Sequence, residues 1–272
     1  MTGLVPSRTE IQTRLEEALA QRLPVAIATV VRGGQVGAKL LILPDETLGS
    51  LGDATLDTEV QAAAPELMSR EESETRAFAI PGREEPVEIF IEVFPPPPTL
   101  LIFGAVHVAQ PLTRFAKALG FDVIVSDARA KLATRERFPD ADRIMQGWPD
   151  ETLAEVVILP NTYVAILSHD PKFDEPALVG TLDTPAAYIG AIGSRKTNED
   201  RRRRLAEAGM SAEQIARLRA PIGLDIGAAT PEEMAISILG EIIALRRGRT
   251  GGSLTTATGR IRGEPEAAVT AR

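Results

Sequence analysis

The chain of 272 residues contains no cysteine. This absence excludes disulfide bonds, cysteine-ligated iron–sulfur clusters and a cysteine nucleophile. Histidine is almost as scarce, because the sequence holds only His107 and His169. A histidine-rich metal site is therefore excluded as well, and we expect no metal ion held by protein ligands alone.

Long hydrophobic runs are also missing. No run approaches the roughly 20 residues that a helix needs to cross a bilayer, and the N-terminal segment MTGLVPSRTE lacks the apolar core of a signal peptide. The formal net charge is −8, whereas generic nucleic-acid and anionic-membrane binders are basic. We expect a cytoplasmic protein with no nucleic-acid partner and no membrane span.

The most informative segment lies in the middle of the chain. A buried-type strand at residues 100–103 is followed by a turn at Gly104, a helical pattern over residues 106–119, a second strand at 122–125 and then Asp127. The offset from Gly104 to Asp127 is close to the 20 or so residues of the Rossmann fingerprint. This segment therefore predicts the first half of a Rossmann unit.

The glycine fingerprint itself is incomplete. Where Gly-x-Gly is expected, the chain has Gly104, Ala105 and Val106. The second glycine normally lets the backbone approach a pyrophosphate, and a branched valine side chain prevents that approach. The fold is thus strongly indicated, while binding of NAD(P) is less so.

Two domains are expected. Residues 1–94 read as a small α+β domain, residues 95–98 as a stiff proline linker, residues 99–249 as a Rossmann-like α/β domain with a parallel sheet, and residues 250–272 as a mobile tail. The helix of the first domain at residues 57–70 contains Pro65, which can break or kink it. The last helix begins at an N-cap, Thr230, and ends near Gly248.

Several polar residues follow strands of the Rossmann-like domain, where open parallel sheets bind ligands. His107 is expected at the start of the first helix, and His169 follows the strand at residues 163–168. Gly193, Ser194 and Arg195 form a turn with backbone N–H groups, a hydroxyl and a guanidinium, which together can hold a phosphate. The alternative for each is structural: a helix-start histidine, or a glycine turn followed by solvated charges.

Two further polar segments are more ambiguous. Asp225 lies in an apolar loop, residues 221–227, which either anchors a ligand or wraps the core. The basic run from Arg201 to Arg204 follows Glu199 and Asp200, and we expect a solvated helix face with local ion pairs.

Taken together, the segments resemble the XdhC/CoxI family, whose members are accessory proteins of molybdenum hydroxylases such as xanthine dehydrogenase and carbon monoxide dehydrogenase. The match covers most of residues 25–248. The segments that carry it stand in family order: LLIFGAVHVAQPL, VIVSDAR, ERFPDAD, SHD, YIGAIGSRK and PIGLDIGAATPEEMAISILGEIIA.

The resemblance has three departures. The family's GAGH is Gly104-Ala105-Val106-His107 here, and its Gly-Ser-x-Pro-Arg loop is shortened to residues 32–35. The family cysteine aligns with Thr55, and the family glutamate with Asp57. A thiolate is the natural soft ligand or sulfur relay in molybdenum chemistry, and threonine cannot replace it.

The resemblance implies a chaperone, not a turnover enzyme, that binds the molybdenum cofactor (molybdopterin), protects it during sulfuration and delivers it to an apo molybdenum hydroxylase. A cysteine desulfurase and a second copy of the chain are the other implied partners. On this interpretation His107 and His169 face the pterin or metal end. Gly193, Ser194 and Arg195 hold the phosphate end, with Gly104, Asp127 and Asp225 as further contacts.

The sequence is also compatible with two other functions. One is an NAD(P)-dependent oxidoreductase, which Asp127 favours and Val106 disfavours, and for which no catalytic acid–base pair is visible. The other is a protein–protein adaptor with a vestigial Rossmann pocket.

Overall fold

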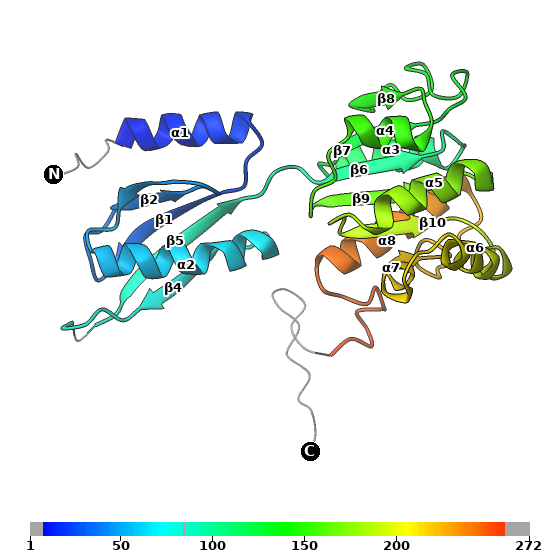
Figure 1. Ribbon diagram of the computed structural model, residues 1–272. Helices are drawn as coiled ribbons and strands as arrows, with labels where there is room; N and C mark the ends of the chain where they lie inside the picture. The colour runs from blue at the N-terminus through cyan, green and yellow to red at the C-terminus, as the bar shows by residue number, and fades with distance from the viewer. Residues whose placement is uncertain (1–7, 84, 259–272) are drawn as a thin grey trace. The chain divides into compact units, whose positions relative to one another are not determined.

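The computed structural model describes residues 8–83 and 85–258 and divides into two compact units, one within residues 1–96 and the other within 97–272 (Figure 1). β5 of the first unit ends at Phe94 and β6 of the second begins at Thr99, so the proline segment 95–98 joins them. Each unit has its own sheet, and the two are described separately.

The first unit is a sheet with one helix on each face. Its strands are antiparallel wherever they pair, in the order β3-β2-β1-β5-β4. In chain order its elements are α1 (Arg8–Ala20), β1 (Val25–Arg32), β2 (Lys39–Ile42), β3 (Thr47–Ser50), α2 (Ala54–Arg70), β4 (Glu74–Phe78) and β5 (Val87–Phe94).

The sequence of β1 explains why both faces are covered. Alternate side chains of a strand point to opposite faces. Val25 and Ile27 pack with α1, while Ala26, Ala28 and Val30 pack with α2. Both sets are buried, so the strand is apolar on both faces over residues 25–28 and does not alternate there.

The helix α2 starts earlier than expected and is not broken by its proline. The Asp53 side chain accepts hydrogen bonds from the N–H groups of Thr55 and Leu56 and so forms the N-cap. The helix continues through Pro65 to Arg70. Its buried stripe, Leu56, Val60, Ala64 and Leu67, is continuous on both sides of the proline, and this packing holds the helix together.

The second unit is a parallel sheet of six strands with the order β11-β10-β9-β6-β7-β8. In chain order its elements are β6 (Thr99–Phe103), α3 (Ala109–Ala118), β7 (Asp122–Ser126), β8 (Arg143–Met145), α4 (Pro149–Glu155), β9 (Thr162–Ile166), α5 (Pro171–Leu182), β10 (Tyr188–Ala191), α6 (Arg195–Glu207), α7 (Ala212–Ala216), β11 (Leu218–Arg219) and α8 (Pro231–Arg246). The expected α/β class, with a Rossmann-like domain after an α+β domain, is confirmed.

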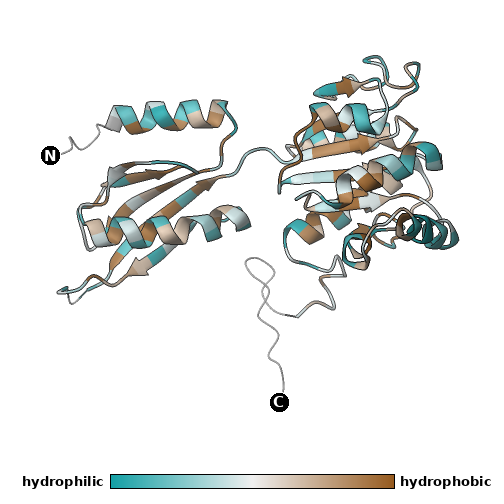
Figure 2. Ribbon diagram, in the orientation of Figure 1, coloured by the Kyte–Doolittle hydropathy of each residue, from teal (hydrophilic) through white to brown (hydrophobic). Residues whose placement is uncertain are grey.

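Helices cover both faces of this sheet, as they must because the strands are apolar on both sides. One core contains Leu100 and Ile102 of β6 with α3 and α8, and the other contains Leu101 and Phe103 with α5. In Figure 2, β6 and β7 are mainly brown, and the helices beside the sheet mix brown and teal residues.

The structure corrects the expected position of His107. α3 begins at Ala109, so His107 lies in the turn before the helix and not within its first turn. The short elements β8 and α4 were not predicted, because three and seven residues are too few to produce a readable periodicity. Most of the expected tail at 250–272 falls on residues 259–272, which lie outside the described residues.

Candidate functional site

The site is organised around the point where the strand order reverses. From β6 the chain proceeds to β7 and β8 on one side, and then returns to β9 on the other side of β6. In open α/β sheets, ligands bind beyond the carboxyl ends of the strands at such a switch point. The turn after β6 and the loop after β9 therefore lie where a ligand of this fold is expected to bind.

These two segments approach each other very closely at Gly104. Its φ is +105°, and a Cβ atom placed there would lie 2.8 Å from the backbone nitrogen of Ser168. Only glycine can occupy this position without displacing the loop after β9. The close packing of these two segments is thus sufficient to explain why residue 104 is glycine.

An open cleft of about 460 Å³ lies at this edge of the sheet. Three loops line it: Val106 comes from the turn after β6, Arg129 from the loop after β7, and Ser168, His169, Asp170 and Pro171 from the loop after β9. The cleft thus brings one predicted site residue, His169, together with the valine that replaces the fingerprint glycine.

Asp127 lies at the end of β7, and its side chain is only 3% exposed. Its Oδ2 accepts hydrogen bonds from the backbone N–H of Ala105 at 2.8 Å and from Nη2 of Arg129 at 2.7 Å. Its Oδ1 accepts from the backbone N–H and from Nε of Arg129, both at 2.9 Å. A carboxylate has about four acceptor sites, so the four contacts use its acceptor capacity.

The electrostatics agree with this hydrogen bonding. Burial acts to raise the pKa of Asp127, but the hydrogen bonds from the Arg129 side chain, the Arg129 backbone and Ala105 outweigh it, and the pKa lies below its ordinary value. The same pair raises the pKa of Arg129. Asp127 is therefore ionised at neutral pH and holds the turn after β6 to the loop after β7.

Arg129 was missed among the candidates taken from the sequence. Its side chain is 58% exposed although Asp127 beneath it is buried, and it lines the cleft. The sequence did contain a signal, an Asp-x-Arg segment directly after a buried strand. At this spacing the arginine side chain can form hydrogen bonds with the aspartate.

The two histidines lie on neighbouring loops, and both are exposed. His169 lines the cleft. From the turn after β6, the residue that lines the cleft is Val106, and His107 is not among the lining residues. Neither imidazole forms a hydrogen bond with another residue in the described part of the chain. Both side chains are therefore able to turn toward a ligand, but only His169 is already in the cleft.

Gly193, Ser194 and Arg195 follow β10, as expected. Ser194 is the N-cap of α6: its Oγ accepts from the N–H of Thr197 at 3.1 Å and lies 2.8 Å from the Thr197 hydroxyl. Gly193 has φ +134°, and Arg195 is the exposed first residue of the helix. Ser194 Oγ thus serves as the helix cap through one of its acceptor sites.

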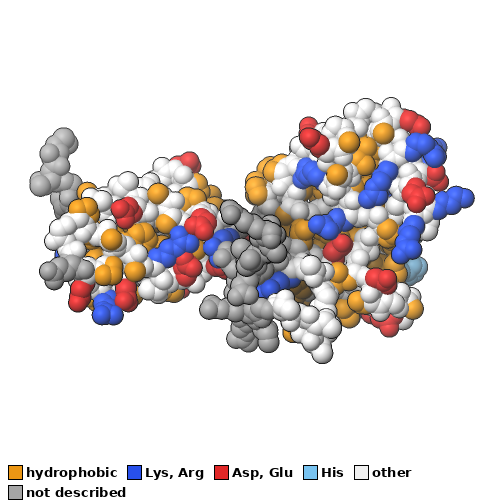
Figure 3. Space-filling model, turned by 90° about the horizontal axis from the view of Figure 1, so that it is seen from below, with side chains coloured by type: hydrophobic (Ala, Val, Ile, Leu, Met, Phe, Trp, Pro, Cys, Tyr) orange, Lys and Arg blue, Asp and Glu red, His pale blue; other side chains and the backbone are white. Residues whose placement is uncertain are grey.

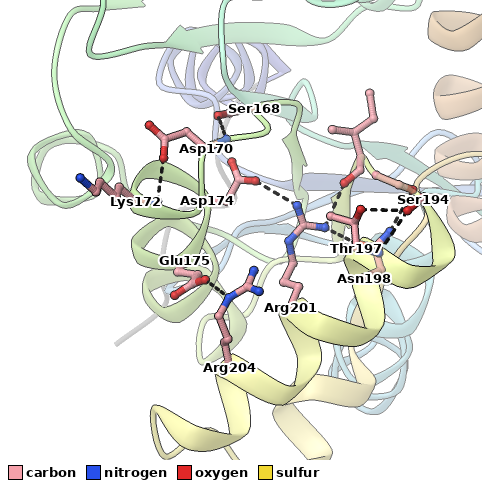
Figure 4. A network of polar contacts seen from close by, with 12 residues as sticks. Ser168, Asp170, Lys172, Asp174, Glu175, Ser194, Thr197, Asn198, Arg201 and Arg204 are labelled. Carbon is pink, nitrogen blue, oxygen red and sulfur yellow. Dashed lines mark hydrogen bonds and ion pairs between the residues drawn. The ribbon is translucent and has the colours of Figure 1, made fainter.

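The prediction that Arg201 lies on a solvated face is wrong. Arg201 forms an ion pair with Asp174 at 2.9 Å, and both side chains are 3% exposed (Figure 4). Its Nη1 also donates to the carbonyl oxygen of Ile192 at 2.9 Å. The buried stripe of α6 is Asn198, Arg201 and Leu205; because it is mostly polar, hydropathy could not reveal it.

The pair lies beneath the loops that carry predicted site residues. Asp174 is in the first turn of α5, shortly after His169, and Ile192 precedes Gly193. Burial raises the pKa of Asp174 despite the opposing effects of Arg201 and Ser168. Asp174 Oδ1 and Arg201 Nε are buried without a hydrogen-bond partner among the described residues. The pair therefore links the segments after β9 and β10.

Asp225 is exposed and is not among the residues that line the cleft. Its loop is fixed to α8 instead: Gly223 N–H donates to Glu241 Oε2 at 2.8 Å, and Ser237 Oγ donates to the carbonyl of Leu224 at 2.6 Å. Tyr188 of β10 donates to the same Glu241 oxygen. These contacts give residues 221–227 a structural role, which is to pack the loop against α8.

In the first unit, the segment before α2 is ordered around Asp57. Its carboxylate accepts from Ser50 Oγ and from the N–H of Leu51, both at 2.7 Å. Gly52 approaches the Gln35 side chain, so the two glycine-containing loops of this unit lie side by side. Thr55 is exposed in the first turn of α2, at the position that aligns with the family cysteine.

Within the described ranges there is no group of three or more acidic or histidine side chains that could hold a metal ion. Over the same residues, every helix is too short or too polar to span a membrane. In the view of Figure 3, acidic and basic side chains are interspersed on each unit, so this face presents no broad basic surface.

Two family models match the chain. The model described as the XdhC Rossmann domain matches residues 100–242, and that of the XdhC and CoxI family matches residues 18–79. The first match contains the whole cleft, and the second contains Thr55 and Asp57.

Among curated proteins, the chain is 31% identical over 255 residues to "Uncharacterized protein YqeB" of Escherichia coli, covering 88% of this chain and 46% of that protein. It is 32% identical over 168 residues to a protein of Bacillus subtilis that is named as a probable subunit of xanthine dehydrogenase (62% and 49%). It is 29% identical over 153 residues to "Molybdenum cofactor insertion chaperone PaoD" of Escherichia coli (56% and 42%). The chain spans about half the length of these relatives.

One solved structure, a crystal structure described as that of a xanthine dehydrogenase from Bacillus halodurans, resembles the chain with a TM-score of 0.52 and 23% identity. The similarity covers 90% of this chain and 97% of that one. It supports the fold over both units.

Proposed function

This chain belongs to the XdhC and CoxI family, and we propose that it is a molybdenum-cofactor chaperone. It binds the cofactor, protects it during sulfuration and helps its insertion into a molybdenum hydroxylase of the xanthine dehydrogenase or carbon monoxide dehydrogenase type. The observation that carries the proposal is the relative named as a molybdenum cofactor insertion chaperone, which matches over 56% of the chain.

The cleft at the switch point suits such a cargo. It offers a guanidinium from Arg129 and an imidazole from His169 in an open cleft of about 460 Å³. An open cleft allows a cofactor to be taken up and passed on, which a chaperone requires. We place the pterin or metal end near His169 and His107.

An NAD(P)-dependent reaction has less support from the same residues. A dinucleotide site needs an acid that is able to accept hydrogen bonds from ribose hydroxyls, but Asp127 already accepts four hydrogen bonds within the protein. Val106 adds a branched side chain where the pyrophosphate backbone contact would be made.

Sulfuration requires a partner. Transfer of sulfur through a protein persulfide needs a thiol, and this chain has none. We therefore propose that a cysteine desulfurase supplies the sulfur while this chain holds the cofactor, and that an apo-hydroxylase then receives the cofactor. We also propose that the chain acts as a homodimer.

A reconstitution experiment tests the proposal. The protein is mixed with cofactor, cysteine desulfurase and apo-hydroxylase, and the amount of active hydroxylase is compared with that in a mixture lacking the protein. We expect a clear stimulation with Thr55 in place. If stimulation appears only with Thr55→Cys, the natural chain is not a working chaperone and an adaptor role replaces it.

A further inference from the structure

We infer that Arg129 binds the anionic group of the ligand in the cleft, and that Asp127 is its positioning residue. The ligand class is a small phosphate monoester and not a dinucleotide. Where the ligand is the molybdenum cofactor, whose pterin carries a phosphate monoester, the inference rests on the proposed function.

Arg129 is held in a way that leaves one edge of its guanidinium free. A guanidinium can form a paired contact along its Nε–Nη2 edge or along its Nη1–Nη2 edge. Asp127 occupies the first edge, with Nε on Oδ1 at 2.9 Å and Nη2 on Oδ2 at 2.7 Å. Within residues 8–83 and 85–258, Nη1 makes no hydrogen bond to another residue, and Nη2 has a second proton on the same side. That edge is available to a phosphate.

The burial of the pair directs this free edge outward. The Asp127 side chain is 3% exposed and the Arg129 side chain 58% exposed, so the acid is on the protein side and the base on the solvent side. Arg129 also lines the cleft. An arginine that is already fixed loses little side-chain freedom when it binds an anion, which favours tight binding.

The surroundings of Arg129 limit the size of the anion. The Asp170 carboxylate is close enough to Arg129 to contribute to its raised pKa, and it also accepts from the N–H of Lys172 at the start of α5. One phosphate needs only the free edge of Arg129. A dinucleotide also needs close backbone contact with its pyrophosphate, and the branched side chain of Val106 stands in the same cleft.

The rival site after β10 is less suited to a phosphate. The sequence indicates Gly193, Ser194 and Arg195 as the phosphate-binding turn, and Ser194 Oγ there accepts the capping hydrogen bond of α6. Arg195 is exposed, and no carboxylate is seen to orient it within the described residues. The Arg129 guanidinium is oriented by Asp127 through two of its nitrogens, Nε and Nη2, and is therefore the better candidate.

Calorimetric titrations of the full chain test the inference. The probes are the molybdenum cofactor, the same cofactor after phosphatase treatment, and inorganic phosphate. We expect Arg129→Ala to weaken cofactor binding about 10- to 100-fold, the scale of a charge-assisted hydrogen bond, and Arg129→Lys to weaken it less. Arg203→Ala is the matched control, because Arg203 is also an exposed, acid-paired arginine, at 65% exposure.

The dephosphorylated cofactor separates a phosphate contact from a general loss of structure. It should bind the wild-type chain and Arg129→Ala equally. Asp127→Asn should weaken binding of the phosphorylated cofactor only, because Arg129 is then no longer held in position for the phosphate. If the substitution instead damaged the cleft as a whole, binding of both forms of the cofactor would be weakened. Inorganic phosphate should compete with the cofactor in the wild type but not in Arg129→Ala.

The outcomes distinguish this inference from the proposed function. If the cofactor binds the wild type and Arg129→Ala equally well, or if Arg195→Ala suffers the loss instead, the inference is wrong while the chaperone proposal stands. If the cofactor does not bind at all, the chaperone proposal fails. In that case Arg129-dependent binding of inorganic phosphate supports the inference, and its absence overturns it.

Discussion

The carboxylate of Asp174 in α5 lies 2.9 Å from the guanidinium of Arg201 in α6, with both side chains 3% exposed. Because Arg201 also donates to the carbonyl of Ile192, this single pair joins the end of β10 to the helix that follows β9 (Figure 4). A buried charge is tolerated only while its partner is present. The pair thus supports α5, whose first residue, Pro171, lines the cleft, from the side of β10.

Removing one member of this pair should destabilise the second unit strongly. Asp174→Ala leaves the Arg201 charge buried without its acid, which costs about 3–5 kcal/mol in unfolding free energy. Arg203→Ala, on the exposed face of the same helix, should change it by under about 0.5 kcal/mol. Trp148 is the sole tryptophan and lies in the second unit, so its fluorescence during urea unfolding reports on the right unit. Equal effects of the two substitutions would contradict the support role.

The Asp127–Arg129 pair should make stability depend on acid pH. The pKa of Asp127 is lower in the folded protein than its usual 3.8. The contribution of the ion pair is therefore fully present above about pH 4–5 and is lost as the pH falls through the folded-state pKa. The stability difference between wild type and Asp127→Asn should shrink between pH 7 and pH 3. If the difference in unfolding free energy stays constant or grows over this range, the negative charge of Asp127 is not what stabilises the fold.

Taking the difference between the two proteins also removes the opposing effect of Asp174. Burial raises the pKa of that group, so its contribution declines as the pH rises through its folded-state pKa. Because Asp174 is present in both proteins, its titration cancels.

The close approach at Gly104 should be measurable against a matched glycine. Gly104 and Gly120 both have positive φ, +105° and +82°, but a Cβ at Gly120 would meet nothing within 4 Å. Gly120→Ala should lose about 1 kcal/mol from backbone strain alone. Gly104→Ala adds the contact with the Ser168 nitrogen and should lose at least about 1 kcal/mol more. Equal losses in thermal or urea unfolding would mean that the loop after β9 moves aside freely.

Restoring the fingerprint glycine should not create a dinucleotide site. We expect the wild-type chain to bind NADH with a Kd above about 100 μM, because Val106 blocks the pyrophosphate. Val106→Gly removes that block but leaves Asp127 engaged on all its acceptor sites, so affinity should rise by no more than about 3-fold. Calorimetry that gives a low-micromolar Kd for either protein would refute this reasoning.

The fold was largely predictable because its signals are local and strong. The apolar strands at β6, β7 and β9, the capping residues of α8 and the proline segment all have short sequence signatures, and the structure has each element near its expected place. Boundaries were less accurate. His107 fell outside α3 because no capping residue marks the helix start: Val108 occupies the N-cap position without a side-chain hydrogen bond.

The candidate site was only partly predictable, because its contacts depend on tertiary structure. Arg201 looked like its charged neighbours on α6 until the fold placed Asp174 opposite it. The Asp-x-Arg spacing after β7 hints at a contact between Asp127 and Arg129, but only the structure shows that this contact fills the acceptor sites of Asp127 and orients Arg129. Ser194 is a predicted phosphate ligand, and its additional role as the helix cap of α6 became visible only in the structure.

The proposed cargo of the cleft is the molybdenum cofactor, and its competitor is a nicotinamide dinucleotide. Equilibrium titration of the purified chain with isolated cofactor, and separately with NADH, decides between them. We expect the cofactor to bind at least about 10-fold more tightly than NADH, a difference of about 1.4 kcal/mol. NADH binding at low-micromolar Kd with no detectable cofactor binding would contradict the chaperone proposal and would make an oxidoreductase the better explanation.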